Sequence, residues 1–293
     1  MIKVLVVDDS ALLRTIVKDM LEEDEGIKVV GIARNKKETL EKIPLLNPDV
    51  ITLNIEMPVS DGIETLKEIN NNFSIPVLML SSRTTKDAEL TLKALEMGAV
   101  DFVTRPTNVF DIGSEETKNK LIERVKIVSK SKNIKNYKSN VKRQYDNCLD
   151  EKNVRYNDKD YGTIVAIRSS TGGPRALQEI IPKIPPNINA SIVVVQHMPK
   201  GFTNSLADRL NTLSKITVKE GENGENLKRG CCYIAPGDYH MNIEMNGGKP
   251  CISLNKEPQV SGLRPTVDIM MKSVSKLDGY KKIGIILTGM GSD

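Results

Sequence analysis

Short apolar runs, each followed by a segment with helical spacing, recur along this chain of 293 residues. The first run, residues 2–7, is apolar apart from Lys3, which is typical of a strand buried on both faces of a parallel sheet. Residues 10–22 then show helical spacing, with Ser10 placed to cap the helix. Because strands that alternate with helices build parallel sheets, the chain is predicted to be an α/β protein.

The alternation occurs in two series. The first predicts further strands near 28–32, 49–54, 75–81 and 100–104, and helices near 36–44, 62–70, 86–97 and 115–130. The second predicts strands at 163–170, 191–196 and 282–289, helices at 175–181, 202–213 and 265–277, and a β-hairpin made by 228–236 and 239–245. Between the series, residues 131–160 are polar, rich in Lys and Asn, and aperiodic. We therefore place a doubly wound α/β domain at 1–125, a linker at 126–160 and a second α/β domain at 161–293.

Composition narrows the class of protein. Aromatic residues make up 4%, Trp is absent and the net charge is +4, so no nucleic-acid partner is expected. No apolar run approaches the roughly 18 residues of a membrane span, and the N-terminus does not resemble a signal peptide. A cytoplasmic protein without membrane insertion is expected. The cysteines lack metal-ligand spacing and are interpreted as reduced thiols: Cys148, Cys231, Cys232 and Cys251.

Polar residues follow the predicted strands of the first series. Asp8 and Asp9 end the first strand, Asn54 the third and Ser81 the fourth, while Arg105 follows the fifth. The carboxyl ends of parallel strands share one edge of the sheet, where ligands bind. Because two adjacent carboxylates favour a hard cation, Mg²⁺ is predicted at Asp8 and Asp9.

The strings VVDDS, DVITLNIEMPVSDG, LMLSSRT and AVDFVTRP resemble the receiver domain of two-component response regulators over residues 1–125. The resemblance implies a flavodoxin-like fold, a metal pocket at Asp8 and Asp9, Ser81 as the phosphate-sensing hydroxyl and Phe102 as an aromatic switch. The family has Asp where this chain has Asn54, and Lys where it has Arg105. Since an amide is no nucleophile towards phosphate, we predict that position 54 accepts no phosphoryl group and that Mg²⁺ binding is weakened.

A second group of polar residues follows three strands of the second series. Ser170 stands before Thr-Gly-Gly and a helix, where backbone N–H groups can stabilise an oxyanion, although a Ser in this place also serves as a helix N-cap. The chain has two histidines, and we favour His197, which follows a parallel strand, over His240, which lies in the hairpin region. Asp293 follows the last strand and is predicted to orient the base. These residues predict a Ser/His/Asp acyl hydrolase and no particular substrate.

The strings SSTGGPRAL, VVVQHMPKGFTNSLADRL, YIAPGDYHM, LRPTVDIMMKS and GIILTGMGSD resemble the catalytic domain of the chemotaxis receptor methylesterases, CheB, from residue 161 onward. The resemblance implies a Rossmann-like domain with Ser170 as nucleophile, His197 as general base and Asp293 as the orienting acid. It also implies oxyanion donors near Thr171 and Met290. The implied reaction, which needs no cofactor, is hydrolysis of glutamate γ-methyl esters and deamidation of glutamine. The implied partners are methyl-accepting chemoreceptors and the chemotaxis histidine kinase.

Two departures from that family favour an alternative. The family has Gly where this chain has Arg168, whose bulk is expected to crowd the strand or the pocket mouth. The family also continues beyond the motif at Asp293, so the C-terminal part of the domain is expected to be missing from this sequence. The alternative is therefore a catalytically impaired homologue that only binds receptor and kinase. A DNA-binding response regulator is disfavoured, because the second series shows no helix-turn-helix pattern and no basic recognition stripe.

Overall fold

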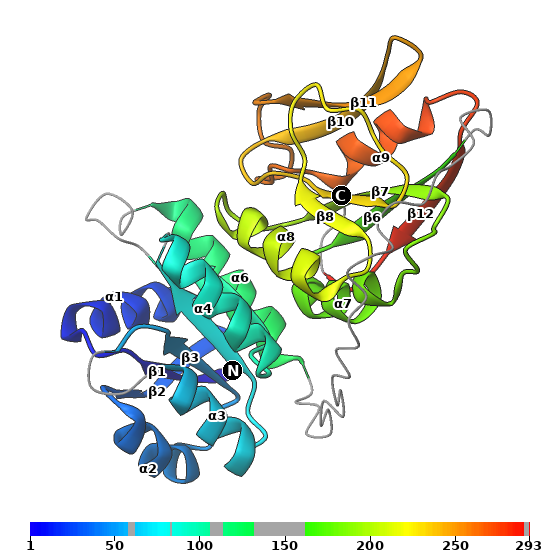
Figure 1. Ribbon diagram of the computed structural model, residues 1–293. Helices are drawn as coiled ribbons and strands as arrows, with labels where there is room; N and C mark the ends of the chain where they lie inside the picture. The colour runs from blue at the N-terminus through cyan, green and yellow to red at the C-terminus, as the bar shows by residue number, and fades with distance from the viewer. Residues whose placement is uncertain (58–61, 83, 106–113, 132–161, 290–292) are drawn as a thin grey trace. The chain divides into compact units, whose positions relative to one another are not determined.

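The computed structural model describes residues 1–57, 62–82, 84–105, 114–131, 162–289 and 293. The chain divides into two compact units, Met1–Val141 and Lys142–Asp293. Each unit contains its own five-stranded parallel sheet, so the predicted α/β class with two domains is confirmed (Figure 1). Nearly all of the predicted linker, including Cys148, lies outside the described residues.

The sheet of the first unit has the strand order β2-β1-β3-β4-β5 and is parallel throughout. Its strands are β1 Ile2–Val7, β2 Ile27–Ala33, β3 Val50–Asn54, β4 Val77–Ser81 and β5 Asp101–Thr104. Its helices are α1 Ala11–Glu22, α2 Lys36–Leu46, α3 Gly62–Asn72, α4 Thr85–Glu96 and α6 Glu115–Ser129. The predicted elements are thus present in the predicted order, and α6 includes the first residues assigned to the linker.

Local sequence signals fix where these helices begin. The Ser10 side chain accepts a hydrogen bond from Leu13 N, which confirms the predicted cap of α1. Asn35 caps α2 in the same way. The apolar faces of α1 and α6 pack on the sheet in one core cluster that contains Val4, Val6 and other fully buried strand residues.

The sheet of the second unit has the order β12-β6-β7-β9-β8 and is also parallel. Its strands are β6 Thr163–Ser169, β7 Ala190–Gln196, β8 Thr217–Glu220, β9 Cys231–Ile234 and β12 Lys281–Ile286. The helices are α7 Gly173–Ile180, the 3₁₀ turn η1 Ile181–Lys183, α8 Phe202–Leu213 and α9 Val267–Ser275. Helix α9 packs on β6 and β10, while Figure 1 shows α7 and α8 on the other side of the sheet.

The predicted hairpin, made by 228–236 and 239–245, is wrong in its first strand. The hairpin is formed by β10 His240–Asn246 and β11 Lys249–Asn255, whereas β9 lies inside the parallel sheet between β7 and β8. The run 231–234 is fully buried, and that pattern fits a central parallel strand better than a hairpin arm with one wet face. Strands β8 and β11 were not predicted, since both mix polar and apolar residues.

The strand order places a ligand-binding edge in each unit. In the second sheet the chain runs from β6 to β7 on one side and returns to β12 on the other, so the carboxyl end of β6 lies at a switch point. In the first sheet the equivalent place is between β1 and β3. No helix among the described residues is long and apolar enough to cross a bilayer.

Candidate active site

Ser170 follows β6 directly and is almost fully buried, with an exposed fraction of 2%. Its backbone N–H donates to Thr288 O at 3.0 Å, and its carbonyl accepts from Gly173 N at 2.7 Å. These bonds fasten the turn between β6 and α7 on both sides. Ser169 differs, because its hydroxyl faces the carbonyl of Val195 at 3.5 Å. The structure thus separates the two consecutive serines and selects Ser170 as the candidate nucleophile.

Glycine is required around this turn. Gly172 has φ +72°, in the left-handed region, and it precedes α7 as the N-cap residue. A Cβ at Gly173 would lie 1.9 Å from Gln196 Oε1. That close approach lets Gln196 Nε2 donate to the Ser170 carbonyl at 3.0 Å. The Thr-Gly-Gly string therefore brings the strand, the turn and the end of β7 into contact.

His197 follows β7, the neighbour of β6, and only 4% of its side chain is exposed. Its Nδ1 atom lies 3.3 Å from Ser170 Oγ, while its Nε2 atom lies 2.9 Å from Asp293 Oδ2. With the ring hydrogen on Nε2, Nδ1 is free to accept the proton of the serine hydroxyl. The predicted Ser–His–Asp constellation is therefore brought together at one edge of the sheet.

Asp293 is buried, with 4% of its side chain exposed, and its two oxygens have different neighbours. Oδ2 faces His197 and also accepts a hydrogen bond from Val267 N at 3.2 Å, at the first residue of α9. A carboxylate is stabilised at a helix N-terminus, where the backbone N–H groups point outward. Oδ1 lies 3.5 Å from Nη2 of Arg168.

Arg168 does not occupy the place that the sequence led us to expect. It lies in β6, is 5% exposed, and its guanidinium reaches the Asp293 carboxylate. The Ser170–His197 contact at 3.3 Å is present beside it. The expectation that this side chain crowds the site is thus not supported by the geometry.

His240, the other histidine, is held in the protein core by contacts of both its ring nitrogens. It is fully buried at the start of β10, and its ring nitrogens contact Thr266 Oγ1 and Pro258 O, both at 3.1 Å. This confirms its predicted place in the hairpin. Of the predicted oxyanion donors, Thr171 lies at the start of the turn and is 8% exposed, whereas Met290 lies outside the described residues.

The receiver-like pocket brings Asp8, Asp9, Asn54 and Arg105 together. Asn54 Nδ2 donates to Asp9 Oδ1 at 3.1 Å and to Glu56 O at 2.7 Å, and Arg105 donates to Asn54 Oδ1 at 3.4 Å. Burial raises the pKa of Asp8 to about 6, opposed by the hydrogen bond from Ser10 N and reinforced by Asp9.

These contacts bear on the predicted Mg²⁺. Asp8 Oδ2 is buried and has no hydrogen-bond partner, which suits a cation. The Asn54 amide, however, points its hydrogens at Asp9 and at the Glu56 carbonyl, where a cation would need those oxygens. Among the described residues, no three His, Cys, Asp or Glu side chains are grouped to hold a metal. The residues present therefore fit Mg²⁺ poorly.

The remaining receiver predictions concern Ser81 and Phe102. Ser81 ends β4, is 1% exposed and accepts a hydrogen bond from Thr91 Oγ1 at 2.8 Å. Phe102 lies in β5 and is 8% exposed. Nearby, burial raises the pKa of Asp87, and the Glu56 carboxylate raises it further. The sequence did not single out Asp87, because an acid in the first turn of a helix is ordinary.

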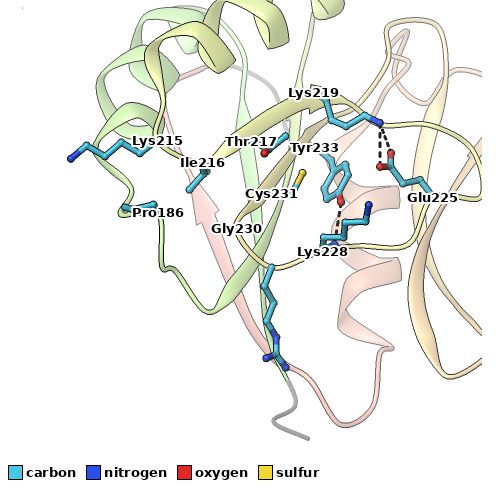
Figure 2. A pocket seen from close by; sticks show the side chains of 11 residues that line it. Pro186, Lys215, Ile216, Thr217, Lys219, Glu225, Lys228, Gly230, Cys231 and Tyr233 are labelled. Carbon is cyan, nitrogen blue, oxygen red and sulfur yellow. Dashed lines mark hydrogen bonds and ion pairs between the residues drawn. The ribbon is translucent and has the colours of Figure 1, made fainter. Parts of the chain in front are cut away.

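A separate hollow of about 380 Å³ lies at the amino ends of β8 and β9, at the opposite edge of the sheet from Ser170 (Figure 2). Lys219, beside it, is paired with Glu225, and Tyr233 accepts a hydrogen bond from Lys228 N at 3.1 Å. It contains no residue of the Ser–His–Asp group, so we do not place the active site there.

Comparisons with known proteins identify the families to which the two units are similar. Residues 165–293 match the family model described as CheB methylesterase, and residues 4–114 match the response regulator receiver domain. The protein-glutamate methylesterase/protein-glutamine glutaminase of Bacillus subtilis (strain 168) is 46% identical over 296 residues, covering 100% of this chain and 83% of that protein. The protein of the same name from Pyrococcus abyssi (strain GE5 / Orsay) is 42% identical over 302 residues, covering 100% and 78%. The catalytic domain of Thermotoga maritima CheB methylesterase is 52% identical, covers 45% of this chain and 70% of that one, and superposes with a TM-score of 0.44. This chain belongs to the CheB methylesterase family, with a response regulator receiver domain preceding the catalytic domain.

Proposed function

We propose that this protein hydrolyses γ-methyl esters of glutamate residues, and deamidates glutamine residues, in methyl-accepting chemoreceptors. The observation that carries the proposal is the placement of Ser170, His197 and Asp293 after three adjacent strands. His197 lies 3.3 Å from the nucleophile and 2.9 Å from the acid. The relatives that carry the methylesterase/glutaminase name align with the whole of this chain.

The proposed reaction has two steps. Ser170 Oγ attacks the ester carbonyl while His197 Nδ1 takes its proton, and the imidazolium then returns that proton to the departing methanol. Water next attacks the acyl-serine, with His197 again taking a proton, and the products are the glutamate carboxylate and free Ser170. For a glutamine substrate the leaving group is ammonia. Asp293 orients the ring and stabilises the imidazolium that forms in both steps.

The turn after β6 can stabilise the negative charge that develops on the carbonyl oxygen of the substrate. Ser170 stands three residues before the first residue of α7, so the oxyanion develops beside outward-pointing backbone N–H groups. We assign this role to the backbone around Thr171. The predicted second donor, near Met290, stays a prediction.

The alternative, a binding module without catalysis, rested on Arg168 crowding the site and on the expected loss of the C-terminal part of the domain, and the structure bears on the first of these. The side chain instead contacts Asp293, while the nucleophile and base are in contact. The receiver domain implies a histidine kinase as partner, and we propose the chemotaxis kinase. Asn54 leaves the receiver without the carboxylate that accepts phosphate, so we propose that esterase activity does not respond to that kinase.

The test uses a methyl-esterified chemoreceptor and measures methanol release by the full chain and by Ser170→Ala. Ser169→Ala is the matched control, because it removes the neighbouring buried hydroxyl, which faces the Val195 carbonyl. Release that disappears in Ser170→Ala and persists in Ser169→Ala supports the proposal. Release that persists in Ser170→Ala contradicts it.

A further inference from the structure

A buried arginine, Arg168, contacts the acid of the triad. Arg168 is the sixth residue of β6, and only 6% of its side chain is exposed. Its backbone lies between two neighbouring strands, where it is paired with Ile286 of β12 and Val195 of β7. An arginine is rarely enclosed in this way unless its charge is matched, because desolvating an unpaired guanidinium is costly.

The matching charge is the acid of the triad. Nη2 of Arg168 lies 3.5 Å from Oδ1 of Asp293, and the Asp293 side chain is itself only 4% exposed. The other oxygen, Oδ2, serves His197 Nε2 at 2.9 Å and accepts from Val267 N at 3.2 Å. Arg168 therefore engages the carboxylate from the side that the base does not use.

We propose that Arg168 is a positioning residue of the triad, which holds the Asp293 carboxylate through Oδ1 and offsets part of the negative charge that reaches His197. This inference rests on the proposed function. The contact is expected to have two separate effects, one on the orientation of the Asp293 carboxylate and one on the protonation of His197. Fixing the carboxylate turns Oδ2 towards the ring and favours catalysis. Offsetting its charge disfavours protonation of His197, so the base stays neutral, and competent, to lower pH.

Among the described residues, the groups placed against His197 and Asp293 come from three elements. Ser170 follows β6 and faces Nδ1, and Arg168 within β6 faces Oδ1. The backbone N–H of Val267 comes from α9, and Asp293 itself follows β12. The Arg168 guanidinium therefore places a positive charge on the side of Asp293 that His197 does not use.

Three variants distinguish the effect of the charge of Arg168 from the effect of its shape. Arg168→Met keeps the length of the side chain and removes its charge, and Arg168→Gly removes both, which provides a second neutral variant if Met packs badly. Arg168→Lys keeps the charge without the planar fork. We expect the neutral variants to lower kcat/KM about 10-fold. We also expect them to raise the midpoint of the acidic limb of kcat/KM by roughly 0.5–1 pH unit. The Lys variant should keep the midpoint near that of the unchanged chain while kcat falls.

A second readout does not need activity. Because the chain contains only His197 and His240, NMR of the imidazole signals can follow each ring through a pH titration of the full protein. The neutral variants should move the midpoint of His197 upward and leave the His240 signal, which reports on a ring held by Thr266 and Pro258, unchanged. The inference is overturned if the midpoint of His197 stays fixed in the neutral variants. It is also overturned if Arg168→Lys shifts that midpoint as far as Arg168→Met does. If the unchanged chain releases no methanol while His197 still shifts as expected, the proposed function fails and the positioning role stands.

Discussion

Gly289 lies directly against Ser170: a Cβ at position 289 would come 2.5 Å from Ser170 Cβ and 3.1 Å from its backbone nitrogen. Gly289 has φ +148°, a conformation that residues with side chains rarely adopt. Because Ser170 N also donates to Thr288 O, the segment after β12 and the nucleophile turn press against each other. The close contact between position 289 and the nucleophile is thus possible because Gly289 has no side chain.

Gly289→Ala should therefore displace Ser170 from His197. We expect kcat/KM to fall at least about 100-fold, since a displacement of about 1 Å at a nucleophile has effects of that size. Gly284→Ala is the matched control, because nothing lies within 4 Å of a Cβ built at that position in β12. Equal losses of activity in the two variants, measured by methanol release, would show that the contact with Ser170 has no special role.

Gln196 provides a second test of the turn. Its Nε2 atom donates to the carbonyls of Ser170 at 3.0 Å and His197 at 3.4 Å, so one side chain links the nucleophile and base segments. Gln196→Ala leaves buried carbonyls without this donor, which costs about 1–3 kcal/mol. We expect kcat to fall with KM little changed, as steady-state kinetics would show. A change confined to KM would indicate a role in substrate binding instead.

The receiver pocket yields a prediction for Asn54. Its amide donates to Asp9 Oδ1 and to the Glu56 carbonyl, so Asn54→Asp replaces a donor with an anionic ligand at the same place. We expect Mg²⁺ affinity to rise about 10-fold or more in calorimetric titrations, because Mg²⁺ is held through carboxylates. The variant should also gain a phosphoryl group from acetyl phosphate, detected by intact mass.

Asn72→Asp, the same change at an exposed site in α3, is the control for that experiment. It should alter neither Mg²⁺ affinity nor mass. Phosphorylation of the unaltered chain at position 54 would contradict the account of the pocket.

Asp8 gives a pH-dependent effect on stability. Its folded-state pKa is raised from 3.8 to about 6, chiefly by burial, so the folded protein binds its proton more tightly than the unfolded chain does. The stability that this proton contributes is complete below pH 3.8 and is lost as the pH rises through about 6. Above that pH the folded protein carries a buried, costly carboxylate.

Asp8→Asn should accordingly raise the free energy of unfolding at pH 8 by about 1–3 kcal/mol and change it little at pH 4. Denaturant titrations of the full chain at the two pH values, without divalent cations, measure the difference. A stabilisation that is equal at both values would mean that the charge of Asp8 is not its cause.

The sequence predicted this architecture well where strands are mostly apolar and followed by helices. β1, β3, β4, β6 and β7 all have that form. It failed at β9, because the loop between β8 and β9 contains no helix to mark a parallel crossover. The hairpin was consequently assigned one strand too early, and β11, with its polar residues, was missed.

The sequence predicted which residues form the Ser–His–Asp group, but it did not predict the other residues that contact them. Ser170, His197 and Asp293 each follow an apolar strand, and their convergence follows from the shared edge of a parallel sheet. The contact of Arg168 with Asp293 depends on the adjacency of β6 and β12, which are far apart in the sequence. The roles of Gln196, Gly289 and the Val267 N–H depend on distances that no spacing rule supplies.

The most direct test of the central claim is methanol release from a methyl-esterified chemoreceptor by the full chain, beside Ser170→Ala and Ser169→Ala. The account predicts release by the unaltered chain and by Ser169→Ala, with a loss of roughly 10³-fold or more in Ser170→Ala, because the nucleophile itself is removed. Absence of release from the unaltered chain, or release that survives in Ser170→Ala, would contradict it.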